Sequence, residues 1–161
     1  MTGVTRTRRM LLRASSLLFL LLAFCSCDGT VMHSFGSSVG NAWLRSDTVV
    51  YVYDGSHSRS GELELSVEAI TLASYRYKNL TIQAECRDSR DSLLSTDTFT
   101  IEVFDDEGWR KGATAGLLYQ LKSVPRAVNF PHGDSIRISL SHLMPADTLV
   151  GVNDVGVRIT N

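Results

Sequence analysis

The sequence predicts an all-β protein, an antiparallel β-sandwich that follows an N-terminal export segment. Apolar and polar residues alternate with a period of two through most of the chain after residue 47. Turns rich in glycine separate the alternating segments, and only a short stretch at 141–147, limited by its proline, could form a helix. Strands with one dry and one wet face are typical of antiparallel sheets, and two such sheets pack on their dry faces. We expect seven or eight strands in an immunoglobulin-like or jelly-roll-like arrangement.

Individual strands follow from this pattern. The segment 47–54, DTVVYVYD, is dominated by β-branched and aromatic residues and predicts the first strand, followed by a polar loop at 55–61. In five later segments every second side chain is apolar, and these positions should form the core. They are Leu63, Leu65, Val67 and Ala69; Leu80, Ile82, Ala84 and Cys86; Phe99, Ile101 and Val103; Ile136, Ile138 and Leu140; and Val155, Val157 and Ile159.

The N-terminal stretch Met10 to Cys27, MLLRASSLLFLLLAFCSC, has the layout of a secretory signal peptide. An apolar run at 17–24 is preceded by basic residues and followed by small residues and cysteine. The uncharged part, 14–27, is shorter than the roughly 20 residues that a membrane-spanning helix needs. The segment should therefore direct export and then be removed. The basic residues that precede or begin it are Arg6, Arg8, Arg9 and Arg13.

The end of this segment indicates lipidation. Small Ser26 precedes Cys27, as in bacterial lipoproteins, which are cut before a cysteine that is then acylated. Cys25 is the alternative site, but bulky Phe24 directly before it disfavours cleavage there. Two or more acyl chains, such as palmitate, anchor a protein stably. We expect residues 1–26 to be the signal peptide, 27–46 to be the lipidated cysteine and a tether rich in glycine and serine, and 47–161 to be the sandwich domain.

Composition narrows the possible functions. Four of the 16 basic residues and none of the 17 acidic ones lie in the signal segment, which leaves 12 basic and 17 acidic residues and a net charge of −5. A mildly acidic net charge does not favour binding to nucleic acid, which requires a basic surface. After removal of 26 of the 161 residues, 135 remain, enough for one domain with a real core.

The chain shows no recognisable catalytic or metal-binding motif. The histidines are His33, His57, His132 and His142, and none has a second ligand at the spacing that zinc sites use. Cys86 lies on the dry face of its strand, where it should be a buried and inert thiol without a disulfide partner. We expect no catalytic residue, no metal, no cofactor and no small-molecule substrate.

The acidic run 105–107 and the two tryptophans each allow both a structural and a functional interpretation. The acidic run 105–107 could contribute oxygens to calcium, but a solvated turn is the simpler interpretation. Trp43 and Trp109 could each close an edge of the sandwich, or each could be an anchor for a protein partner, since aromatic residues dominate interface hot spots. Arg110, beside Trp109, could add a contact at the rim of such an interface.

Several motifs in this order resemble the GldH family of gliding-motility lipoproteins of the Bacteroidetes. The more specific ones are VGNAW at 39–43 and GVNDVGVRI at 151–159. Weaker matches are SCD at 26–28, YRYKNL at 75–80, DT at 97–98 and GWRKG at 108–112. Together they span essentially the whole chain after the signal segment.

The resemblance implies a non-catalytic lipoprotein of the cell envelope, linked to gliding and to type IX secretion, which contacts other envelope lipoproteins. Relatives occur in non-gliding members of the phylum, so the role could be in secretion alone. Surface-exposed lipoproteins of this phylum tend to carry an acidic run soon after the cysteine, whereas here only Asp28 is charged, which favours a periplasm-facing position over surface display. We expect the outer membrane, with the inner membrane as the open alternative. The alternative function is a lipid-anchored sandwich that binds a glycan or another ligand. That function predicts clustered exposed aromatic residues on a concave face.

Overall fold

A computed structural model of the chain describes residues 31–55, 62–131 and 133–160. Within these ranges the regular structure is entirely β, with no helix. The strands are β1 (Val31–Ser38), β2 (Ala42–Leu44), β3 (Val49–Asp54), β4 (Glu62–Leu72), β5 (Asn79–Arg87), β6 (Leu93–Glu102), β7 (Ala113–Ala115), β8 (Leu118–Lys122), β9 (Arg126–Asn129), β10 (Ser135–His142), β11 (Thr148–Val150) and β12 (Val152–Thr160).

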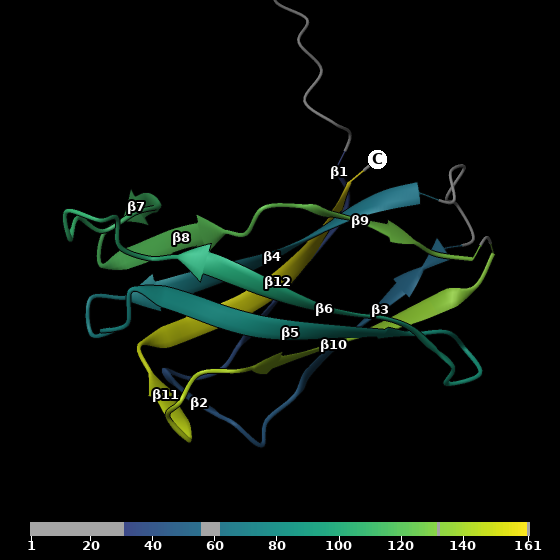
Figure 1. Ribbon diagram of the computed structural model, residues 1–161, viewed down its shortest axis with the longest axis horizontal. Coiled ribbons are helices and arrows are strands. Elements are labelled where there is room, and N and C mark those ends of the chain that lie inside the picture. Colours follow the sequence, from purple (N-terminus) through teal and green to yellow (C-terminus); the bar gives the residue numbers. More distant parts are fainter. Residues whose placement is uncertain (1–30, 56–61, 132, 161) are drawn as a thin grey trace, which may run out of the picture. The chain divides into compact units, whose positions relative to one another are not determined.

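The strands form two main sheets and one small one, and all of the pairings are antiparallel (Figure 1). The larger sheet has the order β1-β12-β4-β8-β7, and β9 also pairs with β4. The second sheet has the order β3-β10-β5-β6, and β2 pairs only with β11. The predicted antiparallel sandwich is therefore confirmed. The strands exceed the expected seven or eight because β2, β7, β9 and β11 are too short to show an alternating pattern.

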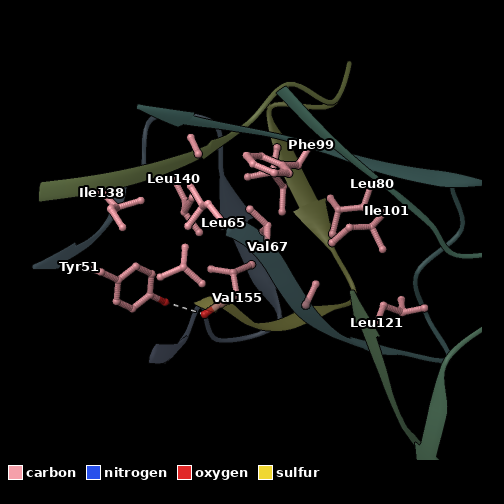
Figure 2. Packing of buried hydrophobic residues seen from close by; sticks show 14 of the residues in the cluster. Tyr51, Leu65, Val67, Leu80, Phe99, Ile101, Leu121, Ile138, Leu140 and Val155 are labelled. Carbon is pink, nitrogen blue, oxygen red and sulfur yellow. Dashed lines mark hydrogen bonds between the residues drawn. The ribbon is translucent and has the colours of Figure 1, made fainter. Parts of the chain in front are cut away.

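The core lies between the two main sheets, and the alternating apolar positions expected from the sequence are all buried. Figure 2 shows side chains from both sheets meeting, among them Leu65 and Val67 of β4 and Ile138 and Leu140 of β10. Tyr51 of β3 adds a polar link across the sandwich, because its hydroxyl donates a hydrogen bond of 2.6 Å to the carbonyl oxygen of Val155. Period-two alternation thus identified the residues that hold the sheets together.

The expected tether is partly built into the fold. Residues 31–38 form β1, which pairs with β12 along its length, and residues 42–44 form β2. The compact unit therefore begins at Val31, earlier than the expected boundary at residue 47. Glycine and serine conceal β1 in the sequence, and its strand conformation comes from pairing with a segment more than a hundred residues away. The signal segment, Cys25 and Cys27 lie outside the described residues.

The short helix expected at 141–147 does not form. β10 continues to His142 because the alternation of buried side chains continues through Leu140 and His142 to Met144, and the chain then bends without helical structure into β11. No helix in the described part of the chain is long and apolar enough to cross a membrane.

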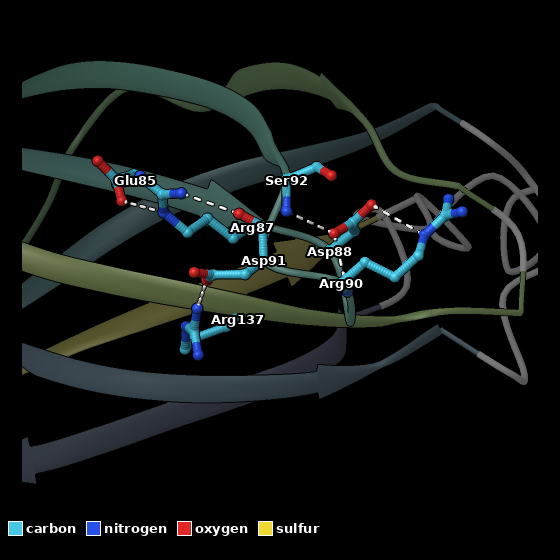
Figure 3. Close-up of polar contacts among 7 residues, drawn as sticks. All are labelled: Glu85, Arg87, Asp88, Arg90, Asp91, Ser92 and Arg137. Carbon is cyan, nitrogen blue, oxygen red and sulfur yellow. Dashed lines mark hydrogen bonds and ion pairs between the residues drawn. The ribbon is translucent and has the colours of Figure 1, made fainter.

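The turn between β5 and β6 is held by a polar network at the end of the second sheet where β10 begins (Figure 3). The buried carboxylate of Asp88 accepts hydrogen bonds from the backbone N–H groups of Arg90, at 2.9 Å, and Ser92, at 2.7 Å. Asp91, with a φ of 69°, forms an ion pair with Arg137 of β10. This network fixes one end of the sheet, and the motifs that resemble GldH gather elsewhere.

Candidate functional site

The strands β1 and β2 pair with β12 and β11 as one continuous ribbon. Ser38 lies opposite Asp154 and Leu44 lies opposite Thr148, so both ladders share a single register. Between the ladders, the amide of Val39 donates to the carbonyl of Asn153 at 2.9 Å. The ribbon therefore brings the 39–43 motif and the start of the 151–159 motif side by side at one end of the sandwich, seen at the lower left of Figure 1.

The ribbon bends at three residues with positive φ angles. Gly40 and Asn41 have φ angles of 67° and 72°, and Gly151, opposite Asn41, has a φ angle of 89°. Glycine and asparagine are the residues that adopt this conformation most readily. The amide of Gly151 also donates to the Asn41 carbonyl at 3.0 Å, so the ladder continues through the bend.

Gly151 also lets the segment after β4 approach closely. A Cβ atom at this position would lie 2.4 Å from the backbone nitrogen of Tyr75 and 2.7 Å from its Cα. The Gly151 carbonyl accepts a hydrogen bond of 2.9 Å from the amide of Leu72. The 151–159 motif thus contacts the start of the 75–80 motif backbone to backbone.

Trp43 is part of the core. Its side chain is 1% exposed, and its indole N–H donates to the carbonyl of Asp47 at 3.0 Å. The ring packs edge to face against His142, with centroids 5.2 Å apart. The structure therefore supports the interpretation of Trp43 as a residue that closes the sandwich, and its ring is not accessible as an anchor for a partner.

His142 is buried beside this tryptophan, on the strand β10. Burial lowers the pKa of His142 below its ordinary value of 6.5, the neighbouring backbone of Trp43 and the Asp147 carboxylate oppose the shift, and the Arg45 guanidinium adds to it. Neither ring nitrogen makes a standard hydrogen bond within the described residues. His142 is therefore a neutral packing residue at neutral pH. The side chains of His33, His57 and His132 lie outside the described part.

Arg110 reaches across to the 75–80 motif. Its guanidinium lies over the rings of Phe104 and Tyr119, 4.6 Å and 4.5 Å from their centroids. The same group donates to the carbonyl of Tyr75 at 2.9 Å and to the hydroxyl of Thr71 at 3.3 Å. Arg110 therefore joins the 108–112 motif to the 75–80 motif, and these contacts occupy the group that was expected at the rim of an interface.

The acidic run 105–107 forms a turn held by local contacts. The Asp105 carboxylate accepts a hydrogen bond of 2.7 Å from the amide of Trp109, and Asp106 forms an ion pair of 2.5 Å with Lys78. This pair lowers the pKa of the exposed Asp106 carboxyl. Across residues 31–55, 62–131 and 133–160, no three His, Cys, Asp or Glu side chains are placed to hold a metal ion.

Trp109 is 74% exposed, so its ring is open to a partner.

Cys86 is a free, fully buried thiol in the four-stranded sheet. Burial raises its pKa to about 11, which keeps the thiol protonated and unreactive at neutral pH. This agrees with the interpretation of Cys86 as a small buried apolar residue.

One face of the β2–β11 pair turns outward at this end of the sandwich. Trp43 and Leu149 point into the core, whereas Leu44 and Val150 on the opposite face are 42% and 56% exposed. Two hollows flank this face. One, of about 360 Å³, is lined by Ser74, Arg76, Tyr77, Thr148 and Val150. The other, of about 450 Å³, is lined by Leu44, Arg45, Ser46, Asp147 and Thr148.

We call this region the motif end: the β2–β11 pair together with the 72–78 and 105–112 segments. Trp43, Trp109 and Arg110 in this region are candidates that the sequence predicts, whereas Arg45 and Arg76 are not among them. Arg45 donates to the carbonyls of Met144 and Pro145 at 2.8 and 2.7 Å, contacts that only the folded structure reveals. Arg76 could have been singled out from its place within the 75–80 motif.

The protein is thus an all-β sandwich in which four of the recognisable motifs meet at one end. Comparison with family profiles matches residues 30–159 to the GldH lipoprotein family. The chain therefore belongs to the GldH lipoprotein family, a family of gliding-motility-related lipoproteins, which places it at the cell envelope as a membrane-anchored protein. No curated protein sequence matches it.

Several solved structures are similar to the chain. One is dimeric latent PorU from Porphyromonas gingivalis, at 11% identity and a TM-score of 0.35, over 84% of this chain and 14% of PorU. Another is Eiger TNF from S. frugiperda, at 12% identity and a TM-score of 0.35, over 80% and 92% of the two chains. A third is the CocE/NonD family hydrolase SACOL2612 from Staphylococcus aureus, at 11% identity and a TM-score of 0.37, over 81% and 31%.

Proposed function

We propose that this protein is a non-catalytic lipoprotein that supports the gliding motility and type IX secretion machinery through contacts with other envelope proteins. Acyl chains on Cys27 hold it at the outer membrane, with the folded part facing the periplasm. Residues 28–30 and the start of β1 connect the anchor to the sandwich. The role proposed for the sandwich is to present a docking surface.

The motif end is the observation that carries this proposal. Four motifs that are far apart in the sequence meet there, and backbone contacts of Gly151 and Arg110 join them. The outward face beside them exposes Leu44 and Val150, with Tyr77 37% exposed nearby. A gathering of exposed apolar side chains rimmed by polar residues is typical of protein interaction sites. This arrangement supports docking better than it supports catalysis.

Deletion of the gene in the organism that encodes the chain tests the proposal. We expect loss of colony spreading, loss of secretion of cargo proteins, or both, and recovery of each by the wild-type chain. A Cys27→Ser chain should appear in the soluble fraction and fail to restore either activity. A Cys25→Ser chain is the matched control and should stay in the membrane fraction and restore both.

Two results would contradict this function. A deletion strain with normal spreading and normal secretion would remove the link to the machinery. Restoration by a freely soluble Cys27→Ser chain would remove the role of the anchor. A strong and specific hit on a glycan array with the purified lipoprotein would favour the alternative, a ligand-binding sandwich.

A further inference from the structure

The hydrogen-bond pattern of the ribbon shows which way the backbone groups of β11 point. The Arg45 amide donates to the Asp147 carbonyl at 2.8 Å, and the Gly151 amide donates to the Asn41 carbonyl at 3.0 Å. In an antiparallel ladder, residues that exchange hydrogen bonds alternate with residues that do not. The bonded residues of the 147–151 segment are therefore 147, 149 and 151, and the backbone groups of Thr148 and Val150 point away from β2.

These groups face the segment that follows β4. The β4 ladder with β12 ends at Thr71 opposite Val152, and the Leu72 amide still reaches the Gly151 carbonyl. Beyond this point the chain turns away, and in the described residues no backbone hydrogen bond joins β11 to the 73–77 segment. The hollow of about 360 Å³ lies here, lined on one side by Thr148 and Val150 and on the other by Ser74, Arg76 and Tyr77. It follows that β11 is an open sheet edge beside a groove.

Arg76 supplies a charge at this groove. Its side chain is exposed and, within the part of the chain that the structure describes, it makes neither an ion pair nor a hydrogen bond. Neighbouring cations are occupied, since Arg45 pairs with Asp147, Lys78 pairs with Asp106, and Arg110 binds the Tyr75 carbonyl. An unpaired guanidinium beside an apolar groove complements a carboxylate, which it can bind with two parallel hydrogen bonds.

We propose that the β11 edge binds an extended segment of a partner protein by β-strand addition. The segment contributes backbone hydrogen bonds to Thr148 and Val150, apolar side chains at alternate positions that contact Val150 and Tyr77, and one Asp or Glu that pairs with Arg76. Strand addition gives affinity through the main chain and specificity through alternate side chains. Because β11 has three residues, the added contact is short and suits a reversible interaction. This inference rests on the proposed docking function and names its surface and partner chemistry.

Selection from a random peptide display library against the whole mature lipoprotein in detergent tests the inference. We expect enriched peptides with alternating apolar residues and one acidic residue. A synthetic peptide of the most enriched sequence should bind the Arg76→Ala chain about tenfold more weakly. The Lys122→Ala chain is the matched control, because Lys122 is also an exposed cation without an ion pair among the described residues, and it should bind like wild type.

A second variant tests the backbone contact. Thr148→Pro removes an N–H that faces the groove and leaves the β2 ladder its bonds, and proline is tolerated at the first residue of a strand. It should weaken binding about tenfold at an unchanged circular dichroism spectrum and melting temperature. Enriched peptides that lack an acidic residue, that bind both variants normally, or that fail to appear would each overturn the inference.

A photo-crosslinking residue placed at Tyr77 in living cells identifies the occupant. The inference expects crosslinks to a segment of another protein with alternating apolar residues and an acidic residue. Crosslinks to a second copy of this chain, or to lipid only, would overturn it. The two proposals can be tested separately. If deletion abolishes spreading or secretion but both variants bind peptide normally, the proposed docking function is retained and the β11 edge is excluded as its site.

Discussion

At the scale of single residues, Gly151 sets the distance between the ribbon and the 75–80 motif. Its φ is 89°, and a Cβ atom on it would lie 2.4 Å from the backbone nitrogen of Tyr75, so there is no room for a side chain. We expect Gly151→Ala to lower the free energy of unfolding by about 2 kcal/mol or more, because it adds both backbone strain and a steric clash. Urea unfolding of the mature chain measures this loss.

Gly108 provides the matched control. It has a φ of 85°, but a Cβ atom there meets nothing within 4 Å. Gly108→Ala should therefore lower the free energy of unfolding by about 1 kcal/mol, from the strain of the positive φ alone. Equal losses in the two variants would show that the close approach to Tyr75 contributes nothing to stability.

His142 should make stability depend on pH. Its folded pKa is lowered by burial below the ordinary value of 6.5, so the unfolded chain binds a proton more readily than the folded one. The stabilising contribution is full above the unfolded pKa and is lost as the pH falls through 6.5 toward the lower folded pKa. Urea unfolding between pH 7.5 and 5 should show this loss in wild type.

The variant His142→Phe keeps an aromatic ring against Trp43 and removes the titrating group. Its free energy of unfolding should fall less steeply over the same pH range than that of wild type. Parallel pH profiles for the two chains would mean that other groups cause the dependence. The other histidines are present in both chains, so the comparison isolates His142.

Residue identity in the core was predictable, whereas residue roles at the motif end were not. Alternation identified Leu65 and Ile138 as buried because a strand places every second side chain on one face. Trp43 has no comparable context, since β2 is three residues long, and its burial depends on packing against His142, which lies far along the chain. The role of Arg110 likewise depends on contacts that the sequence does not show, because its guanidinium lies over the rings of Phe104 and Tyr119 only in the folded chain.

At the scale of secondary structure, the β5–β6 turn depends on one carboxylate. Asp88 is 7% exposed and accepts hydrogen bonds from two backbone N–H groups, so its loss leaves two partly buried donors without this partner. We expect Asp88→Ala to cost about 2 kcal/mol of unfolding free energy. Thermal and urea unfolding measure this change.

Substitution of the neighbouring Arg90 is the control for Asp88. Arg90 has an 84% exposed side chain and a loose 3.8 Å contact with Asp88, so Arg90→Ala should change stability little. A small loss for Asp88→Ala, similar to that for Arg90→Ala, would show that the turn does not need the carboxylate.

Long strands were predictable from the sequence, and the ribbon was not. β4, β5 and β12 each have nine or more residues, enough to display the two-residue period. The glycine and serine content of β1 predicts a tether and hides its strand character, and β11 is too short to carry a pattern. The bend at Gly40 and Gly151 also joins segments that only the register of the folded chain reveals.

At the scale of the whole molecule, membership of the GldH lipoprotein family and the convergence of its motifs support one account. Four of the family-like motifs meet at one end of the sandwich, where backbone contacts fix the scaffold and β11 leaves an open edge. The 151–159 motif reaches this end with its first residues and continues along β12. We therefore expect spreading and secretion to depend on two parts of this protein, the motif end and the lipid anchor. Sequence alone pointed to the motifs, and their meeting at a shared surface required the fold.

Complementation of the deletion strain with chains altered only at the β11 edge tests this account most directly. Wild-type and Lys122→Ala chains should restore spreading and secretion, whereas Arg76→Ala and Thr148→Pro chains should not, at equal amounts in the membrane fraction. Full restoration by both Arg76→Ala and Thr148→Pro would contradict the claim that this protein acts through the β11 edge of the motif end.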